Sequence, residues 1–327
     1  MATIGEALEV ALQHHLAGRL AEAETIYGRV LEAEAEQPDA LHLLGVLAGQ
    51  TGRLEMAADL IRRAIAANGA AADYHENLGN VLRALGHGAE AAAAYRDALD
   101  RDPHRPAVRT AAWELEKDAG RRADFHSHQG QDAFVFETVL GGRRQGVFVD
   151  LGAFDGVTWS NTLFFERTLG WSGLCVEASP TIFTLLELNR ACRCLNVAVT
   201  DRDGEADFLE VEEGALMMGG LCETFTARER AFVESRAVRH RTVRVPARRL
   251  TGILEELGLF HVDYLSVDIE GGERRIIDSM DFRRFTVDAV SLECQRESPD
   301  LRAAMDGHGF DFVCRFEGGD EIYARRR

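Results

Sequence analysis

Residues 146–156 read GVFVDLGAFDG. Val147 to Asp150 have the apolar, β-rich character of a buried strand, and Gly152 and Gly156 follow at once, before a helix-compatible run. The pattern predicts a strand, a glycine loop and the start of a helix. Such a unit presents backbone N–H groups to a ligand, because glycine lets the main chain approach closely and the first N–H groups of a helix lack partners.

The order of the loop residues separates this motif from two better-known ones. A phosphate-binding loop would read GxxxxGK[ST] and a dinucleotide fingerprint GxGxxG, whereas this loop reads DxGxxxG. Asp150 would repel a pyrophosphate, but it suits a ligand that carries an ammonium and a sulfonium group. The motif therefore predicts S-adenosylmethionine as the ligand. A plain tight turn between strand and helix is the alternative that this loop alone leaves open.

Composition limits the class of protein. A chain of 327 residues with 46% hydrophobic residues can form two domains, and a net charge of −17 argues against nucleic acid as a partner. Met1 to Leu20 does not resemble a signal peptide, and no stretch approaches the ~20 apolar residues of a membrane span. We therefore expect a soluble, cytoplasmic protein. Its six cysteines include one CxC pair, Cys192 and Cys194. We interpret all six as reduced thiols.

The first 120 residues contain a repeat. Gly18, Gly52 and Gly86 recur at intervals of 34 residues, and several small and aromatic positions recur in phase with them. This period and these residue types resemble the tetratricopeptide family of helix-turn-helix repeats. The resemblance implies an all-α domain over residues 1–120, with three repeats and a closing helix at Pro106–Asp118. It also implies a groove for a protein partner or for self-association, with the side chains His42, Asp73, Glu76, Asn80 and Arg83.

Residues 121–327 form the second predicted domain. From Val147 onward strand-like and helix-like segments alternate, which predicts a doubly wound, mainly parallel sheet with ligands at the carboxyl ends of its strands. We expect one strand at Cys194–Val199, an irregular stretch after it and a short strand at Thr242–Pro246. The segments Phe310–Cys314 and Glu321–Ala324 predict an antiparallel hairpin at the end of the chain.

Four predicted strands end in an acidic residue, namely Asp150, Glu177, Asp268 and Glu293. Because the carboxyl ends of parallel strands share one edge, these side chains should meet in a single cleft, unless they merely mark where the chain leaves for water. Glu177 lies where a doubly wound nucleotide site places an acid for the ribose diol. The segment Asn196 to Ala198, at the next strand, would border the adenine.

Five motifs in the second domain resemble the FkbM-type S-adenosylmethionine-dependent methyltransferases. They read HQGQD (128–132), FVDLGAFDGVTWSNT (148–162), GWSGLCVEASP (170–180), NVAV (196–199) and DYLSVDIEGGE (263–273). The resemblance implies a class I, Rossmann-like methyltransferase fold. It further implies methyl transfer to a hydroxyl oxygen of a sugar, a glycan or a secondary metabolite.

The resemblance also assigns site residues by position. The methionine end of the cofactor would lie against Asp150, Gly152, Ala153, Phe154, Asp155 and Gly156, and its carboxylate near Ser160 and Asn161. Glu177 and Ala178 would hold the ribose, and Asn196, Val197 and Ala198 the adenine. Asp268 and Glu270 would face the methyl group, and either could serve as general base. Asp268 with Glu293 could instead bind a divalent cation, although the sequence has no unambiguous ligand set.

Two further stretches could shape the acceptor site. Arg236–Arg249 is a basic island that either receives a phosphate or carboxylate of the acceptor or forms a charged strand edge. Glu212–Thr226 contains Met217 and Met218 and predicts a mobile loop over the cleft.

Two rival functions remain at this stage. An oxidoreductase that uses NAD on a similar sheet would need a GxGxxG loop, which the sequence lacks. A non-enzymatic scaffold would rely on the repeats alone, and the intact acids at Asp150, Glu177 and Asp268 argue against it.

Overall fold

The structure is a computed structural model that describes residues 3–294 and 298–326. The chain divides into two compact units, Met1–Arg122 and Ala123–Arg327. No helix within the described residues has both the length and the apolar character needed to cross a membrane.

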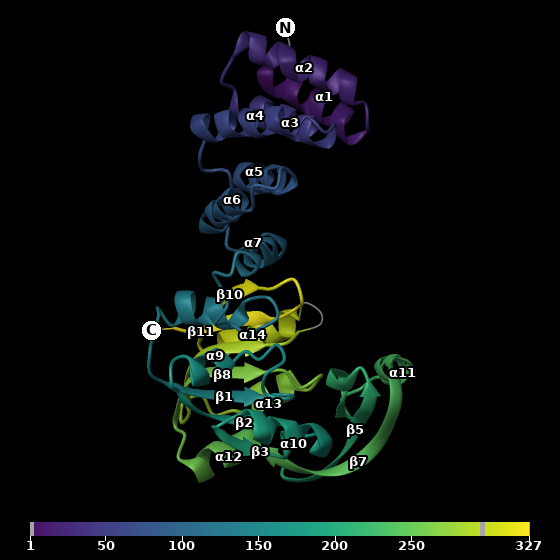
Figure 1. Ribbon diagram of the computed structural model, residues 1–327, viewed down its shortest axis with the longest axis vertical. Helices are drawn as coiled ribbons and strands as arrows, with labels where there is room; N and C mark the ends of the chain where they lie inside the picture. Colours follow the sequence, from purple (N-terminus) through teal and green to yellow (C-terminus); the bar gives the residue numbers. More distant parts are fainter. Residues whose placement is uncertain (1–2, 295–297, 327) are drawn as a thin grey trace. The chain divides into compact units, whose positions relative to one another are not determined.

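The first unit is entirely helical, as predicted. Its helices are α1 (Ile4–Leu16), α2 (Leu20–Ala33), α3 (Pro38–Gln50), α4 (Leu54–Ala67), α5 (Ala72–Ala84), α6 (Gly88–Arg101) and α7 (Pro106–Asp118), stacked in successive pairs with α7 last (Figure 1). Buried alanines, leucines and tyrosines fill the space between the helices.

Left-handed glycines set the turn after each odd-numbered helix. Gly18, Gly52, Gly86 and Gly120 have φ angles of 73°, 79°, 80° and 71°, a conformation that costs glycine little. In each turn the residue after the glycine donates its N–H to a carbonyl five residues back, as Arg19 does to His14 at 2.9 Å. The 34-residue period thus repeats one helix cap, and Gly120 extends it to the end of α7.

Other glycines allow the paired helices to approach. A Cβ atom added at Gly79 would lie 2.5 Å from the ring of Tyr95, and one added at Gly45 would lie 2.6 Å from Ile61. These contacts are far below van der Waals separation. The backbone of α5 at Gly79 therefore packs directly against the Tyr95 side chain of α6, and the backbone of α3 at Gly45 against the Ile61 side chain of α4.

Substitution of Gly79 with alanine is therefore expected to destabilise the helical unit by about 1–3 kcal/mol, because the added methyl group overpacks the contact with Tyr95. Gly28 is the matched control, since it also lies within a helix but has no atom within 4 Å of the added Cβ. Gly28→Ala should instead stabilise the protein by up to about 1 kcal/mol through helix propensity. Thermal unfolding followed by circular dichroism measures both, and equal shifts would contradict the packing argument.

The second unit is built on a seven-stranded sheet in the order β10-β11-β9-β8-β1-β2-β3. Its strands are β1 (Val147–Leu151), β2 (Ser172–Val176), β3 (Arg193–Leu195), β8 (His261–Val267), β9 (Thr286–Leu292), β10 (Phe310–Arg315) and β11 (Glu321–Arg325). Strands β3, β2, β1, β8 and β9 pair in parallel, and β11 is antiparallel to both β9 and β10. The sheet is therefore mixed.

Helices supply residues to a hydrophobic cluster on each side of this sheet. One cluster joins Val149 and Val267 to α12 (Leu250–Leu257), α13 (Glu273–Ser279) and α14 (Pro299–Gly307). The other joins Phe148 and Tyr264 to the π-helix Val135–Val139, α9 (Leu163–Arg167) and α10 (Pro180–Asn189). The short helix α8 (Gln131–Phe134) leads directly into the π-helix.

A second sheet of four strands, in the order β4-β7-β5-β6, corrects the sequence-based prediction. It comprises β4 (Ala198–Thr200), β5 (Gly204–Gly214), β6 (Gly220–Leu221) and β7 (Ala237–Arg249), and α11 (Ala227–Arg236) leads into β7 (Figure 1).

The predicted strand Cys194–Val199 is two strands in two sheets, and the stretch expected to be irregular is mostly β5. The break falls at Asn196, whose side-chain amide donates to the backbone carbonyls of Glu177 and Ala178 at 2.8 and 3.2 Å.

Candidate functional site

A cavity of about 670 Å³ lies at the carboxyl ends of the parallel strands. Glu177, Asp268 and Glu293 each follow the last residue of a strand, β2, β8 and β9 respectively. The cavity brings together most residues that the sequence assigned to a site, namely Asp150, Gly152, Ala153, Phe154, Ser160, Asn161, Glu177, Ala178, Val197, Ala198, Asp268, Glu270 and Glu293.

Three of the residues assigned to the cofactor do not line the cavity and have structural contacts instead. The carboxylate of Asp155 accepts hydrogen bonds from the backbone of Val157 and Thr158 at 2.9 and 2.7 Å. Gly156 has φ +78°, and a Cβ there would meet Arg190 at 2.6 Å. The Asn196 amide supports the turn after β2, as described above. These residues shape the loops around the cavity.

Gly152 fixes the loop that follows β1 and lies against the end of β8. Its φ is +78°, and an added Cβ would lie only 1.6 Å from the backbone oxygen of Asp268. Its N–H donates to the carbonyl of Val176 at 2.9 Å, so the loop is held to β2 as well. Glycine is required here on two grounds, the left-handed backbone and the close approach of a neighbouring main chain.

Backbone strain is concentrated around the cavity. Among the described residues, the non-glycine residues with positive φ are Phe154 (50°), Trp159 (54°) and Glu270 (55°), and all three line the cavity. A side chain in this region costs energy that the surrounding structure must offset, and such residues cluster at functional sites. The strain supports a functional role for this cavity.

The cavity is strongly acidic. Asp150, Glu177, Asp268, Glu270, Glu293 and Asp320 all line it. Within the described part of the chain, its lining contains no lysine or arginine, and His128 is the one histidine. A ligand with a positive charge is therefore favoured, and one with a phosphate or carboxylate facing these groups is disfavoured.

Burial shifts the pKa values of these carboxyl groups upward. It raises the pKa of Glu177 to about 7, although the Glu177 carboxylate accepts hydrogen bonds from the backbone N–H groups of Ser179 (2.7 Å) and Phe154 (3.1 Å). Burial, and then the charge of Glu293, raises the pKa of Asp268 well above its ordinary value. Burial also raises the pKa of Glu293 to about 7. Near neutral pH the site can therefore both hold and release protons.

Asp268 and Glu293 form a hydrogen-bonded acid pair. Two carboxyl groups in such contact share a proton, because both cannot ionise without strong repulsion. Within the described residues, the one group of three metal-type side chains close enough to share an ion is His261, Asp263 and Asp288. That group lies toward the opposite ends of β8 and β9, and Arg143 already pairs with both of its carboxylates.

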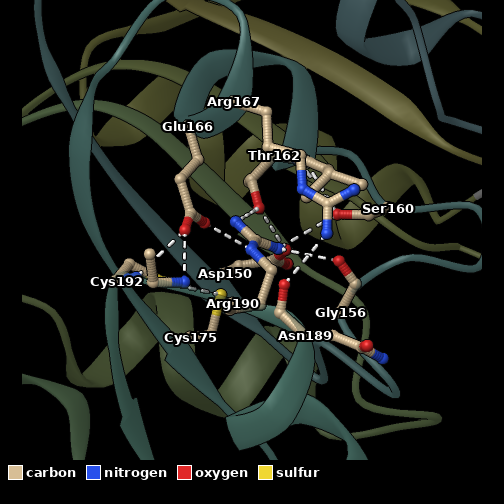
Figure 2. Close-up of polar contacts among 12 residues, drawn as sticks. Asp150, Gly156, Ser160, Thr162, Glu166, Arg167, Cys175, Asn189, Arg190 and Cys192 are labelled. Carbon is tan, nitrogen blue, oxygen red and sulfur yellow. Dashed lines mark hydrogen bonds and ion pairs between the residues drawn. The ribbon is translucent and has the colours of Figure 1, made fainter.

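Arg190 holds the glycine loop in place through hydrogen bonds (Figure 2). The sequence did not indicate this role. The Arg190 side chain is fully buried and pairs with Glu166. It donates to the carbonyl of Gly156 at 3.2 Å and to the hydroxyl of Thr162 at 3.0 Å. Thr162 in turn donates to Asp150 at 2.6 Å. A single arginine after a helix carries no sequence signal for such a role.

The rim of the cavity is aromatic. The rings of Trp159 and His128 stack with centroids 4.5 Å apart, and Trp159 is 51% exposed. Gln131, from the same HQGQD motif as His128, donates to Asp320 in the turn before β11. The motif was noted in the sequence, but nothing there indicated that it would meet residues almost 200 positions later.

The second sheet supplies one wall of the cavity. Phe208 and Val211 of β5 line it, together with Met217, Met218 and Gly219 from the stretch predicted to lie over the cleft. This wall is mostly apolar, in contrast to the acidic strand ends.

The basic island Arg236–Arg249 comprises the last residue of α11 and the whole of β7, and acidic residues of β5 pair with its arginines. Arg241 pairs with Glu210 at 2.8 Å and Arg239 with Glu212 at 2.8 Å, across the β5–β7 ladder. Strand β4 pairs only with Ala247–Arg249, so within the described residues positions 237–246 of β7 pair with β5 on one side alone, as the strand-edge alternative expected. Cross-strand ion pairs account for these arginines, and none of them lines the cavity.

The molecule thus combines a helical repeat with an α/β unit whose acidic cavity lies at the ends of parallel strands. Residues 150–312 match the family model of the methyltransferase FkbM domain, and residues 72–105 match that of the tetratricopeptide repeat. The chain therefore contains an FkbM methyltransferase domain preceded by tetratricopeptide repeat sequence, as the motifs predicted.

Several solved structures are similar to part of this chain. A crystal structure of MamA is 21% identical over 37% of this chain and 71% of its own, with a TM-score of 0.35. The first TPR of Spaghetti (RPAP3), bound to the HSP90 peptide SRMEEVD, is 16% identical over 36% of this chain and 93% of its own, also with a TM-score of 0.35. A comparison with curated proteins found no match.

Proposed function

We propose that the protein is an S-adenosylmethionine-dependent O-methyltransferase that acts on a hydroxyl of a sugar, a glycan or a secondary metabolite. The observation that carries this proposal is the cavity itself, in which six carboxyl groups surround a strained glycine loop inside an FkbM methyltransferase domain. A cationic sulfonium matches this charge, whereas the pyrophosphate of NAD does not.

The strand order supports a class I, Rossmann-like methyltransferase fold. Five parallel strands carry helices on both faces, and β11 runs against its two neighbours next to the last parallel strand. Ligands of open α/β sheets bind at the carboxyl ends of the strands, which is where the cavity lies.

The residues that line the cavity fit this cofactor. The loop at Gly152 leaves room for its methionine end, with Ser160 and Asn161 close by. The Glu177 carboxylate would accept hydrogen bonds from the ribose, and Ala198 would border the adenine. When bound, the cofactor supplies an activated methyl group on a positively charged sulfur.

The remaining task for the chain is to activate and orient the acceptor hydroxyl. Asp268 is the proposed general base, because it lines the cavity at the end of β8 and its raised pKa makes its ionised form a stronger base. Glu293, hydrogen-bonded to Asp268, would share that proton. Glu270, held in a strained conformation beside them, is the second candidate.

The charge of the cavity also limits the acceptor. With no lysine or arginine among its described lining residues and the arginines of β7 already paired, an acceptor that is neutral or cationic fits better than a phosphorylated one. This replaces the hypothesis that the basic island binds an acidic acceptor.

Isothermal titration calorimetry on the full chain tests the proposal. S-adenosylmethionine and S-adenosylhomocysteine should bind and NAD should not, and the reverse order of affinities would favour an oxidoreductase. Binding without any methylated product, judged by mass spectrometry of metabolites and glycans from cells with and without the protein, would favour a scaffold.

Cofactor affinity is expected to rise with pH between about 6 and about 8. The pKa values of Glu177 and Glu293 are about 7, so both carboxyl groups lose their protons in this range and then attract the sulfonium. The folding stability of the protein without cofactor should change in the opposite direction. Because burial raises the pKa values of these two groups from 4.5, they favour folding at low pH and lose that contribution as pH rises through about 7. Titration calorimetry at several pH values measures the first effect, and Glu177→Gln should flatten it.

For the helical unit, we propose a protein partner or self-association as its role, on the strength of the repeat match. The groove residues expected from the sequence are largely satisfied within the stack. His42 is buried and packs against Tyr74 with ring centroids 4.3 Å apart, and Asp73 and Glu76 both pair with Arg105. The six free thiols fit a reducing compartment such as the cytoplasm.

A further inference from the structure

Three thiols gather beside the glycine loop. Cys175 is fully buried in β2, where its register neighbours are Asp150 on β1 and Cys194 on β3. Cys192 lies two residues before Cys194, and its sulfur is 3.5 Å from that of Cys175. This cluster belongs neither to the cavity lining nor to the mechanism described above.

The surroundings of Cys192 favour its thiolate. Its contacts with the thiols of Cys175 and Cys194 lower its pKa, and the nearby Arg190 charge lowers it further, against an opposing effect of burial. The Cys194 thiol also donates to the backbone carbonyl of Cys192 at 3.6 Å. Burial raises the pKa of Cys175. Cys192 is half-buried, whereas Cys175 is fully buried. One thiol is thus set up as the nucleophile and the other as its buried neighbour.

The cluster is tied to the cofactor loop through one acid and one arginine. The carboxylate of Glu166 accepts the backbone N–H of Cys192 at 3.0 Å and pairs with Arg190 (Figure 2). Arg190 holds Thr162 and the carbonyl of Gly156, as described above. A displacement of Cys192 would therefore act on the same guanidinium that anchors the loop.

We propose that Cys175 and Cys192 are an oxidation site at which a hydroperoxide forms a reversible disulfide. The Cys192 thiolate attacks one oxygen of the hydroperoxide, the O–O bond breaks, and the departing oxygen takes up a proton. The resulting sulfenic acid is attacked by the sulfur of Cys175, the S–O bond breaks and water leaves. Overall, two thiols lose two electrons and two protons, and hydrogen peroxide is reduced to two molecules of water.

The disulfide would disturb the loop. Its sulfurs must approach to about 2.0 Å from their present 3.5 Å. Cys175 is held by ladders on both sides of β2, so Cys192 is the residue that moves. The bond also removes the thiolate beside Arg190. We expect cofactor affinity to fall roughly 3- to 30-fold. This effect rests on the proposed function, whereas the disulfide itself does not.

Hydrogen peroxide treatment of the full chain, followed by thiol blocking and peptide mass spectrometry, tests the site. A Cys175–Cys192 cross-linked peptide is expected, lost in Cys192→Ser and in Cys175→Ala and retained in Cys222→Ser, a partly exposed thiol outside the cavity lining. Oxidation of Cys192 to sulfinic acid alone, a Cys192–Cys194 bond or unmodified thiols would each overturn the proposal.

Calorimetry with S-adenosylhomocysteine then tests the link to the loop. Affinity should fall on oxidation and return with dithiothreitol, and Cys192→Ser should be insensitive to peroxide. An unchanged affinity in protein that carries the disulfide would refute the link. Absence of binding by the reduced protein would instead count against the proposed function, while the mass spectrometry still decides on the disulfide.

Discussion

Gly152→Ala is expected to reduce the affinity for S-adenosylmethionine by about 100-fold or more, because small misplacements of a binding loop have effects of that size. The added Cβ would lie 1.6 Å from the carbonyl oxygen of Asp268, so either the glycine loop or the end of β8 must move. Both carry groups that line the cavity. Titration calorimetry of the variant against the wild-type protein measures the loss.

Gly258→Ala separates this clash from the cost of the backbone conformation. Gly258 also has a positive φ, +68°, but no atom lies within 4 Å of an added Cβ. Each alanine should cost about 1–2 kcal/mol of stability for its left-handed backbone. Only Gly152→Ala should impair binding, and wild-type affinity in that variant would show that the loop does not contact the cofactor.

Arg190→Met is expected to destabilise the second unit by about 3–5 kcal/mol, since it leaves the buried carboxyl group of Asp150 and the half-buried carboxylate of Glu166 without their cation. Arg190→Lys should give a smaller loss, because an ammonium keeps the charge but does not match the fork of contacts to Glu166, Gly156 and Thr162. Urea unfolding followed by tryptophan fluorescence measures both.

The matched control is Arg230→Gln in α11, which removes an exposed ion pair with Glu234 four residues away. Exposed pairs contribute little, so the stability of this variant should stay close to that of the wild-type protein. If Arg190→Met were equally harmless, Arg190 would not be the anchor of the loop.

Parts of the fold that depend on local signals were predictable. The helix Pro180–Asn189 carries such local signals, since Ser179 caps it and Pro180 occupies its first position. The repeat followed from glycines at a fixed interval. The acidic residues at strand ends were recognisable because a parallel sheet places all such ends along one edge.

Features that depend on distant partners were not predictable. The alternating arginines and valines of β7 suggested only a short strand, because their acidic partners on β5 lie about 30 residues earlier in the chain. Arg190, Asp320 and the Trp159–His128 pair gained their roles only when the chain had folded. Asn196 was predicted to lie within a strand, yet it lies at the break between β3 and β4, which belong to different sheets.

The switch between sheets at Asn196 has a consequence for the wall of the cavity. Thr200 and Arg249 are direct register partners of β4 and β7, so the excursion between them leaves and rejoins the framework at one point. That excursion brings Phe208, Val211, Met217 and Met218 to the cavity. Because Phe208 shares a hydrophobic cluster with Ala178 and Ala198, which are proposed to border the cofactor, a change of residues between positions 200 and 249 should alter the cavity wall and the cofactor contacts together.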